Sequence, residues 1–249
     1  MEQGKRKEDC EMHEYYAKKM PKLRKAMNSL LKPITDELEK TSGKTYDTVF
    51  SEIWEHYKDN MLENFPYIGG DDVSGTGNLT GAYCFVSMGE VLKRYGADME
   101  EIGHLMVLAY ERRFKGLPGI VKTIMHKSYT NPKSLNKKFQ KKDAQNAANA
   151  ARYPGSFETK TMIPPELGYD FSYHNLVCPL SNFAKTHGYE EYMPYLCNLD
   201  YVMFGAFGVP LFREHTCFED GDYCDFKLKI DANPMEYWPP VFTQGKGFK

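Results

Sequence analysis

Several features that define other protein classes are missing from this chain of 249 residues. No apolar run approaches the ~20 residues that a membrane-spanning helix needs, so no transmembrane segment is expected. Neither sign of charge dominates, because 32 Lys and Arg residues stand against 34 Asp and Glu residues. This balance argues against a uniformly basic nucleic-acid-binding protein. The amino-terminal segment lacks the apolar centre of a signal peptide, so we expect a cytoplasmic protein that binds neither nucleic acid nor membrane.

Short cysteine motifs are also missing, although the chain has six cysteines. No two of them form the C-x₂₋₄-C pair of a typical zinc site, and a reducing cytoplasm would not maintain disulfides. The chain does have 41% hydrophobic and 14% aromatic residues, which is enough apolar surface for a folded core. Four of the six cysteines fall between residues 178 and 224, so any thiol chemistry is expected in that part of the chain.

Charge and periodicity divide the chain into two regions. Residues 1–150 carry 24 basic and 21 acidic groups and show apolar positions at helical spacing, whereas residues 151–249 carry 8 and 13. The first region predicts helices at 9–31, 47–63, 79–95, 98–115, 119–129 and 137–152, with a glycine-rich loop at 63–78. The second predicts the order β-β-α-α-β-β, with elements at 156–163, 167–174, 178–188, 189–207, 210–217 and 223–230. The expected fold is α+β: an N-terminal helical bundle followed by a small antiparallel sheet with helices packed on one face, together one compact unit.

A long basic segment closes the first region. Residues 112–142 contain ten Lys and Arg residues and no Asp or Glu. Such a segment is typical of a solvated helix face or connecting arm. The alternative is an electropositive wall that attracts an anionic ligand.

Cys178 is the first candidate for a reactive group. Pro179 is favoured at the first position of a helix, which makes Cys178 the predicted N-cap. A helix N-terminus lowers the pKa of a thiol, so Cys178 is a candidate thiolate. The alternative is a small apolar residue that simply packs at the helix start.

A carboxylate in an otherwise apolar helix is the second candidate. Asp200 is the one charged residue between Tyr192 and Phe212, and a helix that is apolar all round is a buried helix. A buried carboxylate must be paired, hydrogen-bonded, metal-bound or protonated. Cys197 and Tyr201 share a helix face with Asp200, so a thiol and a carboxylate project together. The alternative is a structural Asp bound to backbone amides.

The last predicted strand carries the third candidates. Cys224 and Asp225 are neighbours, so their side chains point to opposite faces, with Cys224 expected on the core side and Asp225 on the more hydrated side. Cys217 is expected near Cys224 across the turn, and packing is the ordinary role for both.

A zinc site is a further, less favoured hypothesis. Cys178, Cys197, Cys224 and His174 form a chemically reasonable ligand set, but none of their spacings is typical of zinc proteins. We therefore expect no metal and no other cofactor.

Four segments together resemble the L-2-amino-thiazoline-4-carboxylic acid hydrolase-like family. They are FPYIGG (65–70) followed by Asn78, RYPGSF (152–157), VCPLSNFAKTHGYEEYMPYLCNLDY (177–201) and GDYCDFKLK (221–229). The resemblance extends over about residues 45–230, and its motif positions here are Asn78, Cys178, Cys197, Asp200, Cys224 and Asp225. The chain departs from the family at Ser181 and Asn182, where relatives often have a second cysteine.

The resemblance implies a bacterial hydrolase that opens a cyclic amidine or isothiourea at a C–N or C–S bond. The implied substrate is a small anionic heterocycle like 2-aminothiazoline-4-carboxylate, and the implied product is of the N-carbamoyl-cysteine type. A thiolate or carboxylate-activated water suits this electrophile. We expect Cys197 or Cys178 as nucleophile, Asp200 as proton acceptor and amidinium anchor, and His174 as a supporting acid or base. The basic segment or Arg213 would bind the substrate carboxylate, and Asn78, Tyr201, Cys224 and Asp225 would line the site.

A second function remains open. The G-D-x-C-x-F strand also resembles vinyl-reductase-type domains, which implies a non-catalytic module that binds a small ligand or metal. The aromatic-rich helices could also supply a face for a homo-oligomer.

Overall fold

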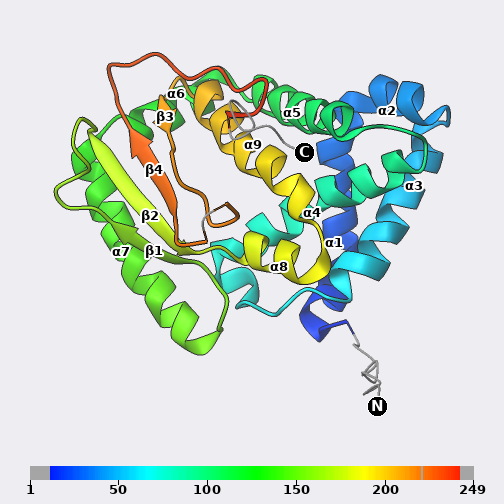
Figure 1. The fold of residues 1–249 in the computed structure, drawn as a ribbon, viewed down its shortest axis with the longest axis horizontal. Helices are drawn as coiled ribbons and strands as arrows, with labels where there is room; N and C mark the ends of the chain where they lie inside the picture. The colour runs from blue at the N-terminus through cyan, green and yellow to red at the C-terminus, as the bar shows by residue number, and fades with distance from the viewer. Residues whose placement is uncertain (1–11, 220, 242–249) are drawn as a thin grey trace.

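The computed structural model describes residues 12–219 and 221–241 and has two parts side by side (Figure 1). One part is a group of helices, and the other is a small twisted sheet with helix α7 (Pro132–Arg152) beside it. Within the described ranges, no helix is long and apolar enough to cross a membrane.

The first part consists of helices that follow the predicted order closely. They are α1 (Glu14–Leu31), α2 (Thr35–Ser42), α3 (Tyr46–His56) with a π-helical continuation (Tyr57–Leu62), α4 (Ser74–Lys93), α5 (Met99–Lys115) and α6 (Gly119–Tyr129). Helix α2 was not predicted. The predicted loop at 63–78 is wrong at its end, because α4 begins at Ser74 and takes in Asn78. Gly75 packs there against the Phe157 ring, so tertiary contact outweighs the low helix propensity of glycine.

The second part confirms the predicted β-β-α-α-β-β order and the α+β class. The strands are β1 (Glu158–Thr161), β2 (Phe171–Val177), β3 (Leu211–Phe212) and β4 (Cys224–Leu228), and the two helices are α8 (Pro179–His187) and α9 (Met193–Ala206). The described strands form one antiparallel sheet in the order β1-β2-β4-β3. Asp143 of α7 accepts hydrogen bonds from both Thr159 and Thr161 of β1, which attaches α7 to the sheet.

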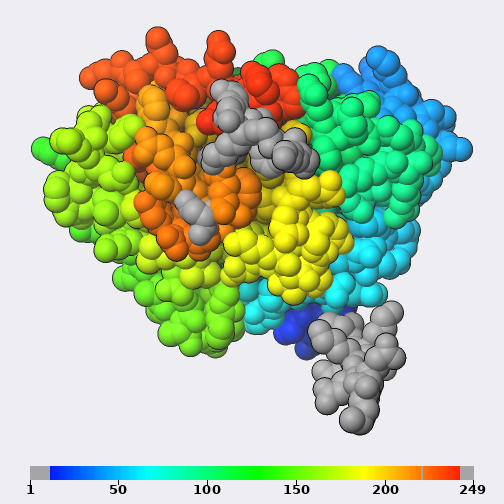
Figure 2. Space-filling view, viewed as in Figure 1, coloured from blue at the N-terminus to red at the C-terminus, as the bar shows by residue number. Residues whose placement is uncertain are grey.

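Helix α9 belongs to both hydrophobic cores of the molecule. Its residues Leu196, Leu199 and Val202 pack with α1–α5 in the first core, whereas Tyr201 and Phe204 pack with the sheet in the second. This double burial explains why the helix is apolar nearly all round. In the space-filling view, the yellow segment that includes α8 and the orange segment that follows β3 lie against each other on one continuous surface with the green and cyan parts of the chain (Figure 2).

Two glycines allow the start of the α9 segment to lie close against the helical part. A Cβ atom added to Gly89 of α4 would meet the Tyr192 ring at 2.5 Å, and one added to Gly103 of α5 would meet the Tyr195 ring at 2.0 Å. Both distances are shorter than real Cβ contacts, so each ring occupies the space that a side chain would fill. The position of α9 therefore depends on these glycines.

We expect Gly103→Ala to lower the free energy of unfolding by about 1–3 kcal/mol, the typical cost of overpacking a filled site. Gly81→Ala is the matched control, because a Cβ at that helical glycine meets nothing within 4 Å. Alanine there should be neutral or stabilise by up to ~1 kcal/mol. Urea unfolding followed by circular dichroism measures both. Equal stability of the two variants would contradict the packing described for Tyr195.

Candidate functional site

A cavity of about 520 Å³ lies between the sheet and helices α4, α7 and α9. Its size is in the ~300–1,000 Å³ range typical of small-molecule sites. Six of the nine predicted site residues line it: Asn78, Cys178, Cys197, Asp200, Arg213 and Cys224. Much of the remaining wall is aromatic, with rings from Tyr110, Tyr129, Phe139, Tyr173, Phe204 and Phe226.

The alternation of side chains in the sheet decides which strand residues reach this cavity. Tyr173 and Asn175 of β2 and Cys224 and Phe226 of β4 line it, and each lies one residue away from a neighbour that faces the other side. Cys224 is therefore on the core side of its strand, as predicted.

Asp225 is on the opposite face, but the prediction that this face is hydrated is wrong. Asp225 is 1% exposed, because the segment after β3 covers it. Its carboxylate accepts hydrogen bonds from the backbone N–H groups of Glu214 and His215 and forms a 2.8 Å ion pair with Lys227. These donors lower the pKa of Asp225 against the effect of burial. Its contacts hold the β3–β4 connection, and the cavity lies on the other side of the strand.

His174 and Tyr201 also lie outside the cavity lining. The Nε2 atom of His174 is 2.7 Å from Oε1 of Glu166, and its ring stacks on Tyr223 at 4.3 Å. Tyr201 is 2% exposed and belongs to the core beside the sheet. This geometry does not support an acid–base role for His174 or a ligand contact for Tyr201. Both roles stay predictions.

Arg213 and Asp200 form an ion pair in the cavity wall. Nη1 of Arg213 donates to Oδ2 of Asp200 at 2.8 Å, and Nε donates to the backbone carbonyl of Asp225 at 3.0 Å. The Arg213 side chain is 1% exposed, whereas that of Asp200 is 35% exposed and lines the cavity. Burial raises the pKa of Asp200, and the guanidinium opposes that rise. A carboxyl group with a raised pKa can carry a proton to a ligand and remove one again.

Cys224 has the most acidic thiol of the cavity. Its sulfur lies 3.3 Å from the Cys217 sulfur and accepts a hydrogen bond from the Cys217 backbone N–H at 3.2 Å. Hydrogen bonding by the Cys217 thiol, with the charge of Arg213, lowers the pKa of Cys224 to about 7 despite burial. The expectation that Cys217 lies near Cys224 is confirmed, and this contact favours the thiolate form of Cys224.

The two thiols predicted as nucleophiles have the opposite shift. Cys178 is the N-cap of α8, as predicted, but burial raises its pKa to about 12 and outweighs the nearby backbone N–H groups. Burial also raises the pKa of Cys197 well above its ordinary value. The backbone N–H groups at the start of α8 do lower the pKa of Cys178, as expected, but desolvation is the larger effect, so the net shift is upward. The electrostatics favour Cys224 over both.

The four residues predicted for zinc do not converge. The three cysteines line the cavity, but His174 lies on the other face of the sheet. In the part of the chain that the structure describes, no group of three or more His, Cys, Asp or Glu side chains is arranged to hold a metal ion. The expectation that the protein works without a cofactor stays a prediction.

The basic segment supplies two cavity residues that were not singled out from the sequence. Arg113 of α5 and Lys142 of α7 both line the cavity, so the interpretation of this segment as an electropositive wall applies to these two positions. Burial lowers the pKa of Lys142, whose ammonium group lies 5.3 Å from the centre of the Phe139 ring. The signal in the sequence was a segment with ten Lys and Arg residues and no acidic residue. Composition does not show which of the ten side chains face the cavity.

Comparison with protein families gives a match to the model of the L-2-amino-thiazoline-4-carboxylic acid hydrolase family over residues 99–228, just over half of the chain. The chain belongs to this family. The chain is thus related to hydrolases, as the resemblance of its motifs implied. Neither the curated proteins nor the solved structures contain a match.

The family match covers most of the cavity. It extends from α5 to the end of β4 and so includes Asp200, Arg213 and all three cavity cysteines, whereas Asn78 of α4 lies outside it. The three thiols, the Asp200 carboxylate and the buried Arg213 therefore all lie within the matched residues.

Alkylation of Cys224 by iodoacetamide should increase with pH through a midpoint near 7. In Cys217→Ala the midpoint should rise by about one pH unit, because a hydrogen bond to a charged group contributes ~1.5 kcal/mol or more. Cys217→Ser keeps a donor and should leave the midpoint nearly unchanged. Peptide mass spectrometry after timed labelling reports Cys224 separately from the other thiols. An unchanged midpoint in Cys217→Ala would show that the Cys217 thiol does not stabilise the thiolate.

Proposed function

We propose that this chain is a thiol-dependent hydrolase that opens a cyclic isothiourea, with Cys224 as the nucleophile. The observation that carries the proposal is the lowered pKa of the Cys224 thiol in a cavity that also holds the Arg213–Asp200 pair. A nucleophile, a proton carrier and a fixed cation then contact one ligand. The family supports hydrolysis, and 2-aminothiazoline-4-carboxylate is the proposed substrate type.

In the first proposed step, the Cys224 thiolate attacks C2, the carbon bonded to the ring sulfur and two nitrogens. A C–S bond to the enzyme forms, and the bond between C2 and the ring sulfur breaks. Protonated Asp200 delivers a proton to the leaving ring sulfur, which departs as a thiol. The raised pKa of Asp200 favours the protonated form that this step needs.

In the second proposed step, water completes the hydrolysis. The ionised Asp200 accepts a proton from water as the hydroxide adds to the same carbon, and the C–S bond to Cys224 breaks. Cys224 leaves as the thiolate that began the cycle, Asp200 is protonated again, and the released isourea tautomerises to an N-carbamoyl-cysteine-type product. One water molecule is consumed, and no oxidant or reductant is required.

Lys142 is proposed to bind the carboxylate of the substrate. Arg213 is already held by Asp200 and two backbone carbonyls, whereas Lys142 lines the cavity without a hydrogen bond or ion pair to any residue in 12–219 or 221–241. Because burial destabilises the charged ammonium group, an anionic ligand would restore a partner that its surroundings lack.

A panel of single substitutions separates the nucleophiles. We expect Cys224→Ser to reduce kcat/KM for 2-aminothiazoline-4-carboxylate by at least ~10³-fold and Asp200→Asn by ~10²–10⁴-fold. Cys178→Ser and Cys197→Ser should change it by less than about tenfold, because their thiols are protonated at neutral pH. Mass spectrometry of the carbamoylated product measures turnover, and circular dichroism confirms folding.

Two outcomes would overturn parts of this proposal. Retained turnover in folded Cys224→Ser, with loss in Cys178→Ser or Cys197→Ser, would assign the nucleophile to one of the originally predicted thiols. No turnover by the native protein, together with tight binding of the thiazoline, would favour the non-catalytic ligand-binding module.

A further inference from the structure

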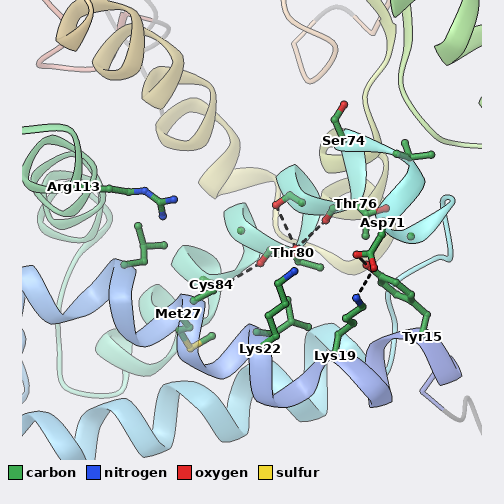
Figure 3. A pocket seen from close by; sticks show the side chains of 17 residues that line it. Tyr15, Lys19, Lys22, Met27, Asp71, Ser74, Thr76, Thr80, Cys84 and Arg113 are labelled. Carbon is green, nitrogen blue, oxygen red and sulfur yellow. Dashed lines mark hydrogen bonds and ion pairs between the residues drawn. The ribbon is translucent and has the colours of Figure 1, made fainter. Parts of the chain in front are cut away.

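A second cavity of about 410 Å³ adjoins the first, on the side of α4 that faces α1 (Figure 3). Five residues line both cavities: Leu30, Ser74, Gly77, Gly81 and Arg113. The two spaces therefore meet along one face of α4 and beside Arg113. None of the chemistry proposed above uses the second cavity.

Two glycines leave the shared wall open. Gly77 and Gly81 are one helical turn apart, and a Cβ atom added at either position meets nothing within 4 Å. Any larger side chain there would project into the space that both cavities share. The α4 face therefore allows a ligand to extend from one cavity into the other.

The charge of the second cavity is positive. Its lining includes three cations, Lys19, Lys22 and Arg113, and one carboxylate, Asp71. Asp71 pairs with Lys19 and accepts a hydrogen bond from Tyr15, so one cation is neutralised (Figure 3). Lys22 and Arg113 form no hydrogen bond or ion pair with a described residue. They extend from α1 and α5 toward the cavity and remain available to an anion.

An unpaired hydroxyl provides an independent sign of a missing partner. Thr76 lines the second cavity in the first turn of α4 and is 3% exposed. Its Oγ1 atom has no hydrogen-bond partner in the described ranges 12–219 and 221–241. Buried hydroxyls are rarely left unpaired in native proteins, and the start of α4, which has no side-chain cap, further favours negative charge.

Apart from a few hydroxyl groups, the remaining lining is apolar. Leu23, Met27 and Leu30 of α1 face Val73 and the glycines of α4. A free inorganic anion would leave this surface without a contact, whereas a ligand with an apolar stem would cover it. A single five-membered ring at Cys224 would also leave much of the combined space unfilled.

We propose that the second cavity binds the anionic end of an extended substrate, a carboxylate or phosphate on an apolar stem that passes over Gly77 and Gly81 to the reacting head at Cys224. Lys22 and Arg113 contact the anion. This inference rests on the proposed function for the position of the reacting head. Its test measures binding and does not require turnover.

The test uses dansyl-undecanoic acid, a fluorescent carboxylate with a long apolar stem, and its uncharged amide. Lys22→Gln and Arg113→Gln should each weaken carboxylate binding by about threefold or more and by about tenfold together, with little effect on the amide. Lys25→Gln is the matched control, because Lys25 is exposed on α1 and lines neither cavity. Equal carboxylate affinities across these variants would overturn the inference.

The path over α4 is tested by protection of Cys224. The dansyl carboxylate should slow alkylation of Cys224 at least about threefold, whereas propionate, which has no stem to reach the thiol, should not. Gly81→Leu should remove this protection, and Gly77→Leu serves as a second obstruction if the first variant does not fold. Equal protection by both acids, or protection unchanged in a folded leucine variant, would overturn the continuous path.

Failure of the two proposals gives different results. If 2-aminothiazoline-4-carboxylate is turned over but the carboxylate probe binds independently of Lys22 and Arg113, the second site is wrong and the hydrolase proposal stands. If the probe binds with the stated dependence but no thiazoline is opened, the anion site stands and the hydrolase proposal fails.

Discussion

The rest of the site depends on one buried cation. The Arg213 guanidinium is 1% exposed, and such a charge is stable only when its donors are occupied. Its N–H groups donate to Asp200 and the Cys197 carbonyl on α9 and to the Asp225 carbonyl on β4. The same cation therefore joins the buried helix to the interior strand β4 of the sheet, and its charge acts on the pKa values of the nearby thiols and of the Asp200 carboxyl group.

Four cysteines share this environment, yet one of them is favoured as a thiolate. Burial raises the pKa of every thiol, and each pKa unit corresponds to ~1.4 kcal/mol, so a thiolate needs donors as well as a nearby cation. Cys224 has the Cys217 backbone N–H and thiol beside it, whereas burial dominates at Cys178 and Cys197. The thiol with the lowered pKa is thus the one with Cys217 beside it across the β3–β4 connection, rather than the one at the helix N-terminus.

Sequence periodicity was sufficient to predict the α+β class, the order of strands and helices and the burial of α9. Pro179 was sufficient to predict Cys178 as an N-cap. These features depend on contacts close in sequence or on a strong apolar pattern. Three features depend instead on which distant segments pack over a residue: the pKa of Cys224, the burial of Asp225 and the position of Lys142 in the cavity wall. The local sequence does not show this packing. Asn78 illustrates the same limit, since the helical start of α4 depends on Phe157, far along the chain.

The glycines of α4 have two different physical roles, close packing and open space, which cannot be distinguished from composition. At Gly89 the missing side chain is replaced by the Tyr192 ring, so glycine there contributes to packing. At Gly77 and Gly81 nothing replaces it, although an interior helical glycine costs about 0.5–1 kcal/mol relative to alanine. A fold optimised for stability alone would favour alanine at both positions. Glycine at these positions leaves open the wall that the thiol-bearing cavity shares with the cationic one. With the proposed extended substrate, this opening would link the stability of α4 to the length of the substrate.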